Sequence, residues 1–108
     1  MTEIIIKGNT GNGNTVIETE NIEGRLDALI IESFENLDII IKSTLGYEIF
    51  HTASHIGTKY YAPRAIQMGS VRRLIVNDQF DKFNLNEPLE IIVNGARDTD
   101  FTIILRVL

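Results

Sequence analysis

The fold is decided by LDALIIESFENLDIIIKSTLGYEIF, the stretch from Leu26 to Phe50. It contains three apolar runs rich in β-branched residues, Leu26–Ile31, Leu37–Ile41 and Tyr47–Phe50. Isoleucine loses side-chain freedom in a helix and packs well on a pleated surface, so these runs favour strands. The short segments between them, Ser33–Asn36 and Ser43–Gly46, are typical of hairpin loops. The stretch therefore predicts a three-stranded antiparallel meander.

The first part of this stretch also allows a helix. Its apolar residues fall at helical spacing, at Leu26, Leu29, Ile30, Phe34 and Leu37. Such a helix would begin near Gly24 and end near Asn36. The run of β-branched residues favours the strand interpretation, and the sequence leaves both interpretations open for residues 24–37.

The remaining chain has the pattern of further short strands separated by turns. Strands are predicted at Glu3–Lys7, Thr15–Thr19, Val71–Val76, Leu89–Asn94 and Phe101–Leu108. Residues 51–60 are predicted as a loop with ragged strand ends. Residues 60–67 contain a proline, which cannot donate to a ladder, and are predicted as an edge strand or an extended loop. The pattern predicts one all-β domain over residues 1–108, a jelly-roll-like antiparallel β-sandwich or barrel of about eight or nine short strands.

Composition limits the possible functions. Hydrophobic residues make up 44% of the 108 residues, which is enough for one core. The chain has no cysteine, so disulfides and thiolate metal sites are excluded. No apolar run approaches the ~20 residues that a membrane-spanning helix needs. The first residues also lack the basic and apolar regions of a secretion signal, so we expect neither a membrane location nor secretion.

Charge is unevenly distributed along the chain. The formal net charge of −5 argues against general nucleic-acid binding. Residues 1–58 contain three basic and nine acidic residues, whereas residues 59–77 contain four basic residues and no acid. An acidic surface of one copy could thus meet a basic surface of another. The alternative is that these charges only solvate strand faces and loops.

No group of residues in the sequence predicts catalysis or metal binding. The two histidines, His51 and His55, have the spacing of helical metal ligands, but their surroundings do not read as a helix. The glycine-rich linker Gly8–Asn14 matches neither a dinucleotide fingerprint nor a Walker loop, and it is predicted as a flexible hairpin loop. We expect no enzymatic activity, no cofactor and no metal site.

Two features predict contacts with other proteins. Several predicted strands place isoleucine on the face that should be solvated, at Ile5, Ile40, Ile92 and Ile104. Exposed apolar patches usually mark contact surfaces, unless a bulge or loop covers them. Adjacent tyrosines on a strand face opposite ways, which predicts one core and one interface tyrosine at positions 60 and 61. Together with the linker at residues 8–14, the candidate contact residues are Lys59, Tyr60, Tyr61, Arg64, Arg72 and Arg73.

Several segments resemble small β-sandwich proteins of tailed-bacteriophage virions. They are RLDALIIES, LDIIIKSTLGYEIF, GTKYYAPRA, FNLNEPLEIIVNGA and FTIILRVL. The shared features are a strand meander, a GTKYY-P segment and a closing LNEPLEI-V-G hairpin. The resemblance implies a capsid auxiliary, decoration or head–tail joining subunit that is assembled in the host cytoplasm. It also implies self-association and docking of many copies on a capsid or connector, and no catalytic residue carries over. The residues also allow a stand-alone β-sandwich module that binds a glycan or a host protein.

Overall fold

The computed structural model describes residues 1–66 and 80–108, which contain strands and no helix. In chain order the strands are β1 (Thr2–Asn9), β2 (Asn14–Glu18), β3 (Ile22–Ser43), β4 (Glu48–Tyr61), β5 (Ala65–Ile66), β6 (Phe80–Asp81), β7 (Phe83–Glu87), β8 (Leu89–Gly95) and β9 (Asp100–Val107). The all-β prediction is confirmed, and the helix considered for residues 24–37 is wrong because they belong to β3. The strand predicted at residues 71–76 lies outside the described residues.

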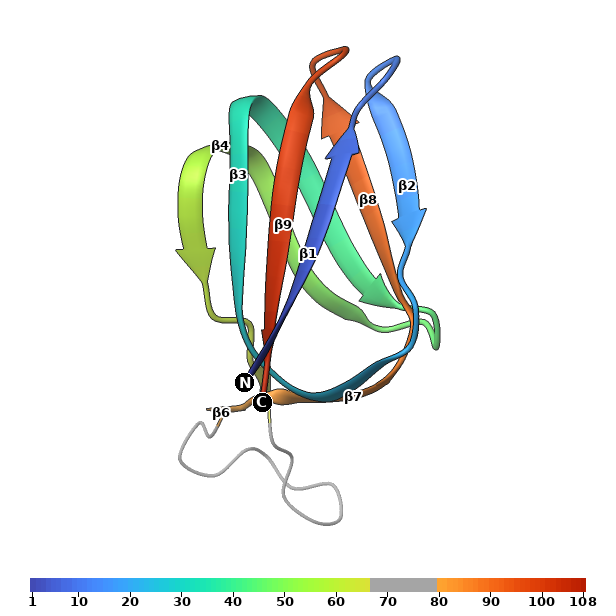
Figure 1. Ribbon diagram of the computed structural model, residues 1–108, viewed down its shortest axis with the longest axis vertical. Helices are drawn as coiled ribbons and strands as arrows, with labels where there is room; N and C mark the ends of the chain where they lie inside the picture. Colours follow the sequence, from blue (N-terminus) through green and yellow to red (C-terminus); the bar gives the residue numbers. More distant parts are fainter. Residues whose placement is uncertain (67–79) are drawn as a thin grey trace.

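The long strand β3 organises the sheet. Along one edge its first half pairs with β9 and its second half with β8, while β4 follows it over both halves. The start of β3 pairs with β7. The sheet is therefore folded over along β3 and β4, as Figure 1 shows. We name its two parts the first half-sheet (β1, β9, and the adjoining parts of β3 and β4) and the second half-sheet (β2, β8, and the remaining parts of β3 and β4).

Residues 34–36 form the corner between the half-sheets. Ser33 pairs with Gly57 and Leu37 pairs with His55, so β3 has more residues than β4 between these pairs. Such a bulge bends a strand and lets it pass from one sheet layer to the other. The predicted three-stranded meander is therefore wrong, because its first loop is a bend within β3. The second predicted loop is confirmed as the β3–β4 turn, where the amide of Gly46 donates to the carbonyl of Ser43 at 2.9 Å.

The loop predicted for residues 51–60 is also wrong, because these residues lie within β4. Their polar composition reflects an edge strand rather than a loop, since much of β4 is exposed to solvent. Ser54 and Gly57 have positive φ values of 60° and 83°, and these two residues flank the part of β4 that turns the corner. β4 thus follows the bend of β3 without leaving the sheet.

The core lies between the two half-sheets. Alternate residues of the central strands point inward and are buried, as expected for sheets with one solvated face. Each fully buried aliphatic side chain contributes about 1.5–3 kcal/mol relative to an exposed one. The inner layer includes Leu29, Ile31, Ile39, Ile41, Ile91, Val93, Ile103 and Leu105.

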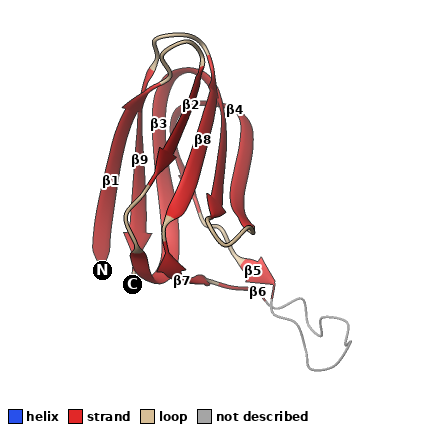
Figure 2. Cartoon of the chain, turned by 90° about the vertical axis from the view of Figure 1, so that its right-hand side faces the viewer, coloured by secondary structure: helices blue, strands red, loops and turns tan. Residues whose placement is uncertain are grey.

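β1 and β2 are consecutive in the chain but belong to opposite half-sheets. The strand order is β1-β9-β3-β8-β2, so the hairpin predicted around Gly8–Asn14 is wrong. The connection between β1 and β2 is hydrogen-bonded to the turn between β8 and β9. Figure 2 shows both at the same end of the molecule. The buried Thr10 donates its hydroxyl to the carbonyl of Ala96 at 2.6 Å and its amide to the carbonyl of Thr99 at 3.0 Å. These bonds replace the strand pairing that a hairpin would have provided.

The closing hairpin expected from the phage-protein resemblance is also not formed. β7 and β8 flank Pro88, and each pairs with a different part of β3 rather than with the other. In the described part of the chain, no helix has the length and apolar character needed to cross a membrane.

Candidate interaction surface

A row of apolar side chains crosses the outer face of the first half-sheet. Strand register places Ile5 of β1 opposite Ile104 of β9, Ile104 opposite Ile30 of β3, and Ile30 opposite Tyr60 of β4. Ile5 and Tyr60, at the two ends, are 58% and 59% exposed. Ile30 and Ile104, in the middle, are half-buried. We call these four residues row one.

A second row crosses the outer face of the second half-sheet. Val16 of β2 lies opposite Ile92 of β8, Ile92 opposite Ile40 of β3, and Ile40 opposite His51 of β4. Val16 and His51 are exposed, and the two isoleucines are half-buried. We call these four residues row two. Each half-sheet therefore carries a mainly apolar row on the side that faces water, and row two ends at the polar side chain of His51.

The prediction that certain isoleucines face outward is confirmed, although not all of them are fully exposed. Ile5 is exposed, while the isoleucines at positions 40, 92 and 104 lie on the outer face and are half-buried. Ile30 was not among the predicted outward residues, because residues 24–37 also allowed a helix with Ile30 on its apolar face. The alignment of these residues in rows was also not predicted, because register joins residues that are distant in the chain.

Charged pairs flank both rows. Beside row one, Arg106 Nε donates to Glu3 Oε2 at 2.8 Å, and the Arg106 guanidinium carbon lies 5.7 Å from the centre of the Tyr60 ring. Beside row two, Lys42 Nζ lies 3.7 Å from Glu90 Oε1. An apolar strip bordered by polar groups resembles the core and rim of a protein interface.

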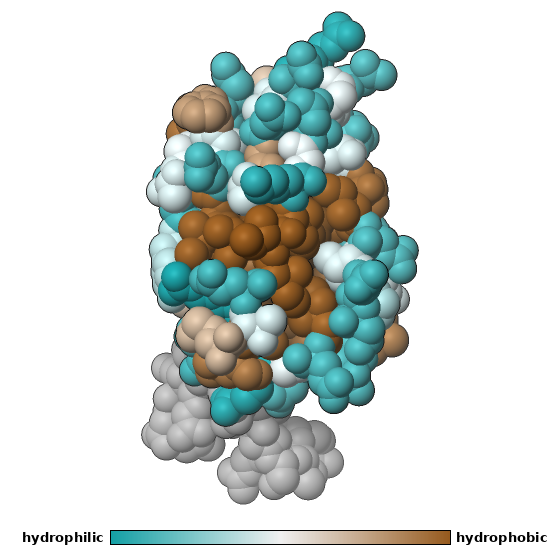
Figure 3. Space-filling model, in the orientation of Figure 1, coloured by the Kyte–Doolittle hydropathy of each residue, from teal (hydrophilic) through white to brown (hydrophobic). Residues whose placement is uncertain are grey.

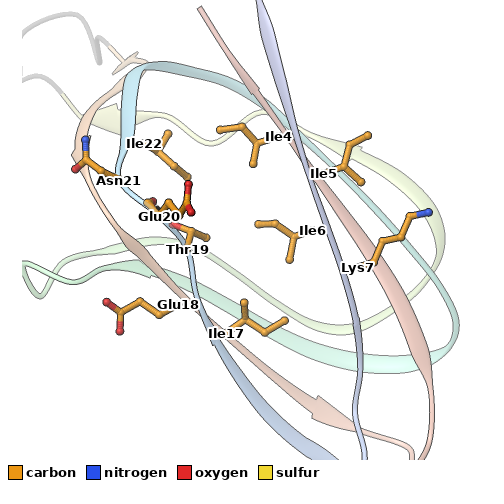
Figure 4. Close-up of a pocket in the computed structure, with 10 residues that line it drawn as sticks. All are labelled: Ile4, Ile5, Ile6, Lys7, Ile17, Glu18, Thr19, Glu20, Asn21 and Ile22. Atoms are coloured by element: carbon orange, nitrogen blue, oxygen red, sulfur yellow. Dashed lines mark hydrogen bonds between the residues drawn. The ribbon is translucent and has the colours of Figure 1, made fainter.

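A groove lies between the edge strands of the two half-sheets, β1 and β2, which do not pair with each other. It has a volume of about 480 Å³. Ile4 and Ile6 from β1 and Ile17 from β2 point into it, while Ile5 and Lys7 point to the other side of β1 (Figure 4). Figure 3 shows apolar side chains gathered in the middle of this side of the molecule. The groove thus exposes part of the inner apolar layer.

The two adjacent tyrosines point in opposite directions. Tyr60 is exposed in row one, whereas Tyr61 is half-buried with its ring centre 4.7 Å from that of Phe50. The Tyr61 hydroxyl lies 2.7 Å from Nδ1 of the buried His55. The predicted opposite facing is thus confirmed, with Tyr61 toward the core and Tyr60 on the surface, and the interface role of the surface tyrosine stays a prediction.

The other predicted contact residues do not gather around Tyr60. Lys59 is exposed, but it pairs with the inward-facing Ile31 and so projects from the other side of the sheet. Arg64 is tied to Asp27, whose carbonyl accepts from Arg64 Nη1 at 3.0 Å and whose carboxylate lies 3.9 Å from Nη2. The arginines predicted as contacts at positions 72 and 73 lie outside the described residues. A contact role for this set stays a prediction.

The two histidines do not converge on one site. His51 lies on the outer face beside Asp38, whereas His55 is 1% exposed at the corner of β4. His55 Nε2 donates to the carbonyl of Gly57 at 2.8 Å. Burial lowers the pKa of His55, and the nearby positive charge of Lys59 lowers it further. Within the described ranges, no three His, Cys, Asp or Glu side chains are grouped closely enough to hold a metal ion.

The most prominent surface features of the described chain are thus the two apolar rows and the apolar groove. These features suit contacts between proteins. The chain matches no protein-family model, and no curated protein matches it in sequence.

Proposed function

We propose that this protein is a non-catalytic structural subunit that docks in many copies on other protein surfaces. The sequence resemblance suggests the setting, a capsid or a head–tail connector of a tailed-phage virion. In this proposal rows one and two are the docking surfaces, and the charged pairs beside them fix orientation. Self-association of the subunit is part of the same proposal.

The observation that supports the proposal most directly is the presence of an aligned apolar row on each outer face. Scattered exposed apolar residues are normal on soluble proteins, but an aligned strip is typical of a contact surface. Burying such a strip contributes about 25 cal/mol for each Å² of apolar area removed from water. Many weak contacts of this kind are sufficient when a subunit binds a repeating lattice, because the contacts act together.

Paired substitutions test which row docks. Ile30→Thr/Ile104→Thr removes apolar groups from the middle of row one and keeps β-branching, and Ile40→Thr/Ile92→Thr does the same in row two. Each pair is the control for the other. We expect at least one of the two pairs to weaken cosedimentation with assembled tailed-phage capsids or connectors by about tenfold or more, with unchanged strand content by circular dichroism.

Two outcomes would contradict the proposal. The first is a wild-type protein that stays monomeric at high concentration and binds neither capsids nor connectors. The second is wild-type binding by both paired variants, which would place docking away from the rows.

A glycan-binding module is the second candidate, because one exposed tyrosine could stack on a sugar. Tyr60 is 59% exposed, and the guanidinium group of Arg106 lies close to its ring. Aromatic rings with polar neighbours are common in binding sites. Binding to a glycan array that is lost in Tyr60→Ala and kept in Tyr61→Ala would favour this candidate over the structural subunit.

A further inference from the structure

The outer edge of β1 is an unprotected strand edge. Among the described strands, β1 pairs only with β9, and this pairing runs from Thr2 to Asn9 without a register shift. The backbone amides and carbonyls along its other edge are therefore open to a further strand. Proteins usually block such edges with proline, bulges or inward-pointing charges. β1 contains no proline and no bulge in its pairing with β9, and its inward residues are Ile4 and Ile6; its only charged residues, Glu3 and Lys7, are on the outer face.

The other long edge of the sheet is blocked. β4 has register shifts at the corner and near its start, and Ser54 and Gly57 have positive φ. These irregularities interrupt the ladder that another strand would need. β2, the edge strand of the second half-sheet, has only five residues. β1 is thus the edge best suited to pair with another chain.

We propose that β1 pairs antiparallel with β1 of a second copy, around a two-fold axis at Ile5. This inference deepens the self-association in the proposed function by naming the surface and the register. Ile5 lies opposite Ile5 of the second copy, and Glu3 lies opposite Lys7 on the same outer face. The Ile5 contact lies on the axis and occurs once, whereas the Glu3–Lys7 contact occurs twice, as two-fold symmetry requires. Opposite charges in directly facing positions stabilise antiparallel pairs.

Neighbouring registers lack this complementarity. In the pair, outward-facing residues must lie opposite outward-facing residues. The nearest alternative two-fold axes therefore pass through Ile4 or through Ile6. An axis at Ile4 places Glu3 against Ile5, and an axis at Ile6 places Lys7 against Ile5. Both registers lose the two Glu–Lys contacts. The sequence of β1 therefore selects one register out of three.

Within the described chain, Lys7 has no ion-pair partner and can therefore pair with Glu3 of the second copy. It points to the outer side of β1 (Figure 4). Glu3 accepts from Arg106 through Oε2, which leaves its second carboxylate oxygen for Lys7 of the second copy. In the dimer the three groups form an alternating chain of charges beside row one.

In the same register, the second copy lies over the apolar groove and extends row one. Ile4 and Ile6 of the second copy face inward beside the mouth of the groove, whose walls include Ile17 and Ile22. On the outer side, the two copies of Ile5 join their rows into one strip that runs from Tyr60 to Tyr60. A single contact thus covers the exposed inner layer and doubles the length of the docking strip.

Disulfide formation tests the register. Facing residues of an antiparallel pair have Cα atoms about 4.5–5.5 Å apart, which a disulfide can bridge. The wild-type chain contains no cysteine, so Ile5→Cys can cross-link only to its own equivalent. Val16→Cys is the matched control, because Val16 is also 58% exposed and also lies on an edge strand.

We expect Ile5→Cys to form a disulfide-linked dimer at least about tenfold faster than Val16→Cys under mild oxidation. Equal rates for the two variants would overturn the proposal.

Charge exchange gives a second test that needs no cysteine. Lys7→Glu alone places glutamates opposite each other, and Glu3→Lys alone places lysines opposite each other. We expect each variant to raise the dimer dissociation constant by about tenfold in sedimentation analysis. A mixture of the two variants should form a heterodimer about as tightly as the wild-type dimer, because every glutamate then faces a lysine.

The outcomes separate this proposal from the proposed function. A wild-type protein that remains monomeric, or variants that do not recover on mixing, would refute the β1 dimer even if the protein still docks on capsids. A two-fold dimer in the Ile5 register that binds neither capsids nor connectors would leave the dimer standing and refute the lattice role. Strand content of each variant, measured by circular dichroism, shows that the substitutions act on association rather than on folding.

Discussion

At the scale of single residues, the corner of β4 depends on a buried neutral histidine. His55 donates from Nε2 to the Gly57 carbonyl, so Nδ1 of the neutral ring accepts from the Tyr61 hydroxyl. These two bonds satisfy both ring nitrogens of a side chain that is 1% exposed. A proton added at Nδ1 would put a charge into the core edge and turn the acceptor into a donor.

This arrangement predicts a loss of stability in mildly acidic solution. Burial holds the pKa of His55 below 6.5, its ordinary value and the value expected in the unfolded chain. Between the folded pKa and 6.5 the unfolded state binds more protons, so the free energy of unfolding falls as pH falls below about 6.5. One such group contributes a slope of at most ~1.4 kcal/mol per pH unit. Urea unfolding at pH 7.5, 6.5 and 5.5 measures it.

Two variants assign that slope to His55. His55→Gln keeps a donor and an acceptor but cannot take up a proton in this range, so it should flatten the slope. His51→Gln makes the same substitution at the exposed histidine, and its slope is compared with that of His55→Gln. A slope that survives in His55→Gln would assign the pH dependence to other groups.

A second buried polar pair behaves differently because it is charged. Glu87 is 6% exposed, and it accepts a hydrogen bond from the Tyr47 hydroxyl and one from the Asn86 amide. Burial raises the pKa of Glu87, but the hydrogen bonds from Tyr47, Asn86 and Ser43 outweigh burial and lower it overall. Its contribution to stability is therefore present above pH 4.5 and is lost only in stronger acid. The two effects occupy separate pH ranges.

At the scale of elements, the corner decides how much of the fold the sequence could predict. Strand character was predictable from β-branched runs, and the β3–β4 turn from its polar, glycine-containing segment. The bend at residues 34–36 has the same polar composition as a turn. The chain bends there without reversing its direction, because the part of β3 before the bend pairs with β9 and the part after it pairs with β8. Both β8 and β9 come much later in the chain. Local sequence does not contain that information.

Gly95 makes the corner possible where β8 meets β3. It has a φ of +156°, and a Cβ placed there would lie 2.5 Å from the carbonyl oxygen of Asn36. Gly95→Ala should lower the free energy of unfolding by about 2–4 kcal/mol, because both strained backbone and a clash with backbone atoms result. Chemical denaturation of the purified variant measures this loss.

Gly46 supplies the matched control in the β3–β4 turn. Its φ is +110°, but a Cβ there would meet no atom within 4 Å. Gly46→Ala should therefore cost only about 1 kcal/mol, from backbone strain alone. Equal losses for the two variants would show that the contact with Asn36 is unimportant for the corner.

At the scale of the whole molecule, the candidate surface was less predictable than the fold. Alternation in single strands identified the outward isoleucines, such as Ile5 and Ile104. Their alignment depends on the pairing of β1 with β9, which joins opposite ends of the chain. The groove between β1 and β2 depends on their separation into different half-sheets, whereas the sequence predicted a hairpin. Surfaces built from long-range register are therefore found only when the topology is known.

The same long-range pairing predicts that the chain tolerates circular permutation. Thr2 pairs with Val107, and Figure 1 shows the two termini side by side. A short loop of the hairpin kind, about four residues long, can therefore join Leu108 to Met1. New ends placed between Thr44 and Leu45 would open an exposed turn and leave every strand intact, because Leu45 is 75% exposed. We expect this permutant to keep the wild-type strand content and to lose no more than about 2 kcal/mol in urea unfolding.

A permutant opened between Leu29 and Ile30 is the matching negative control. It has the same linker but cuts β3 where it holds β9 on one side and β4 on the other. Both cut ends would leave buried backbone groups and the fully buried Leu29 without a continuous strand to hold them. We expect this permutant not to fold, because β3 joins β9 to β4 in the first half-sheet and continues into the second half-sheet. If it folded as stably as the permutant opened at the turn, β3 would not be the strand on which the two half-sheets depend.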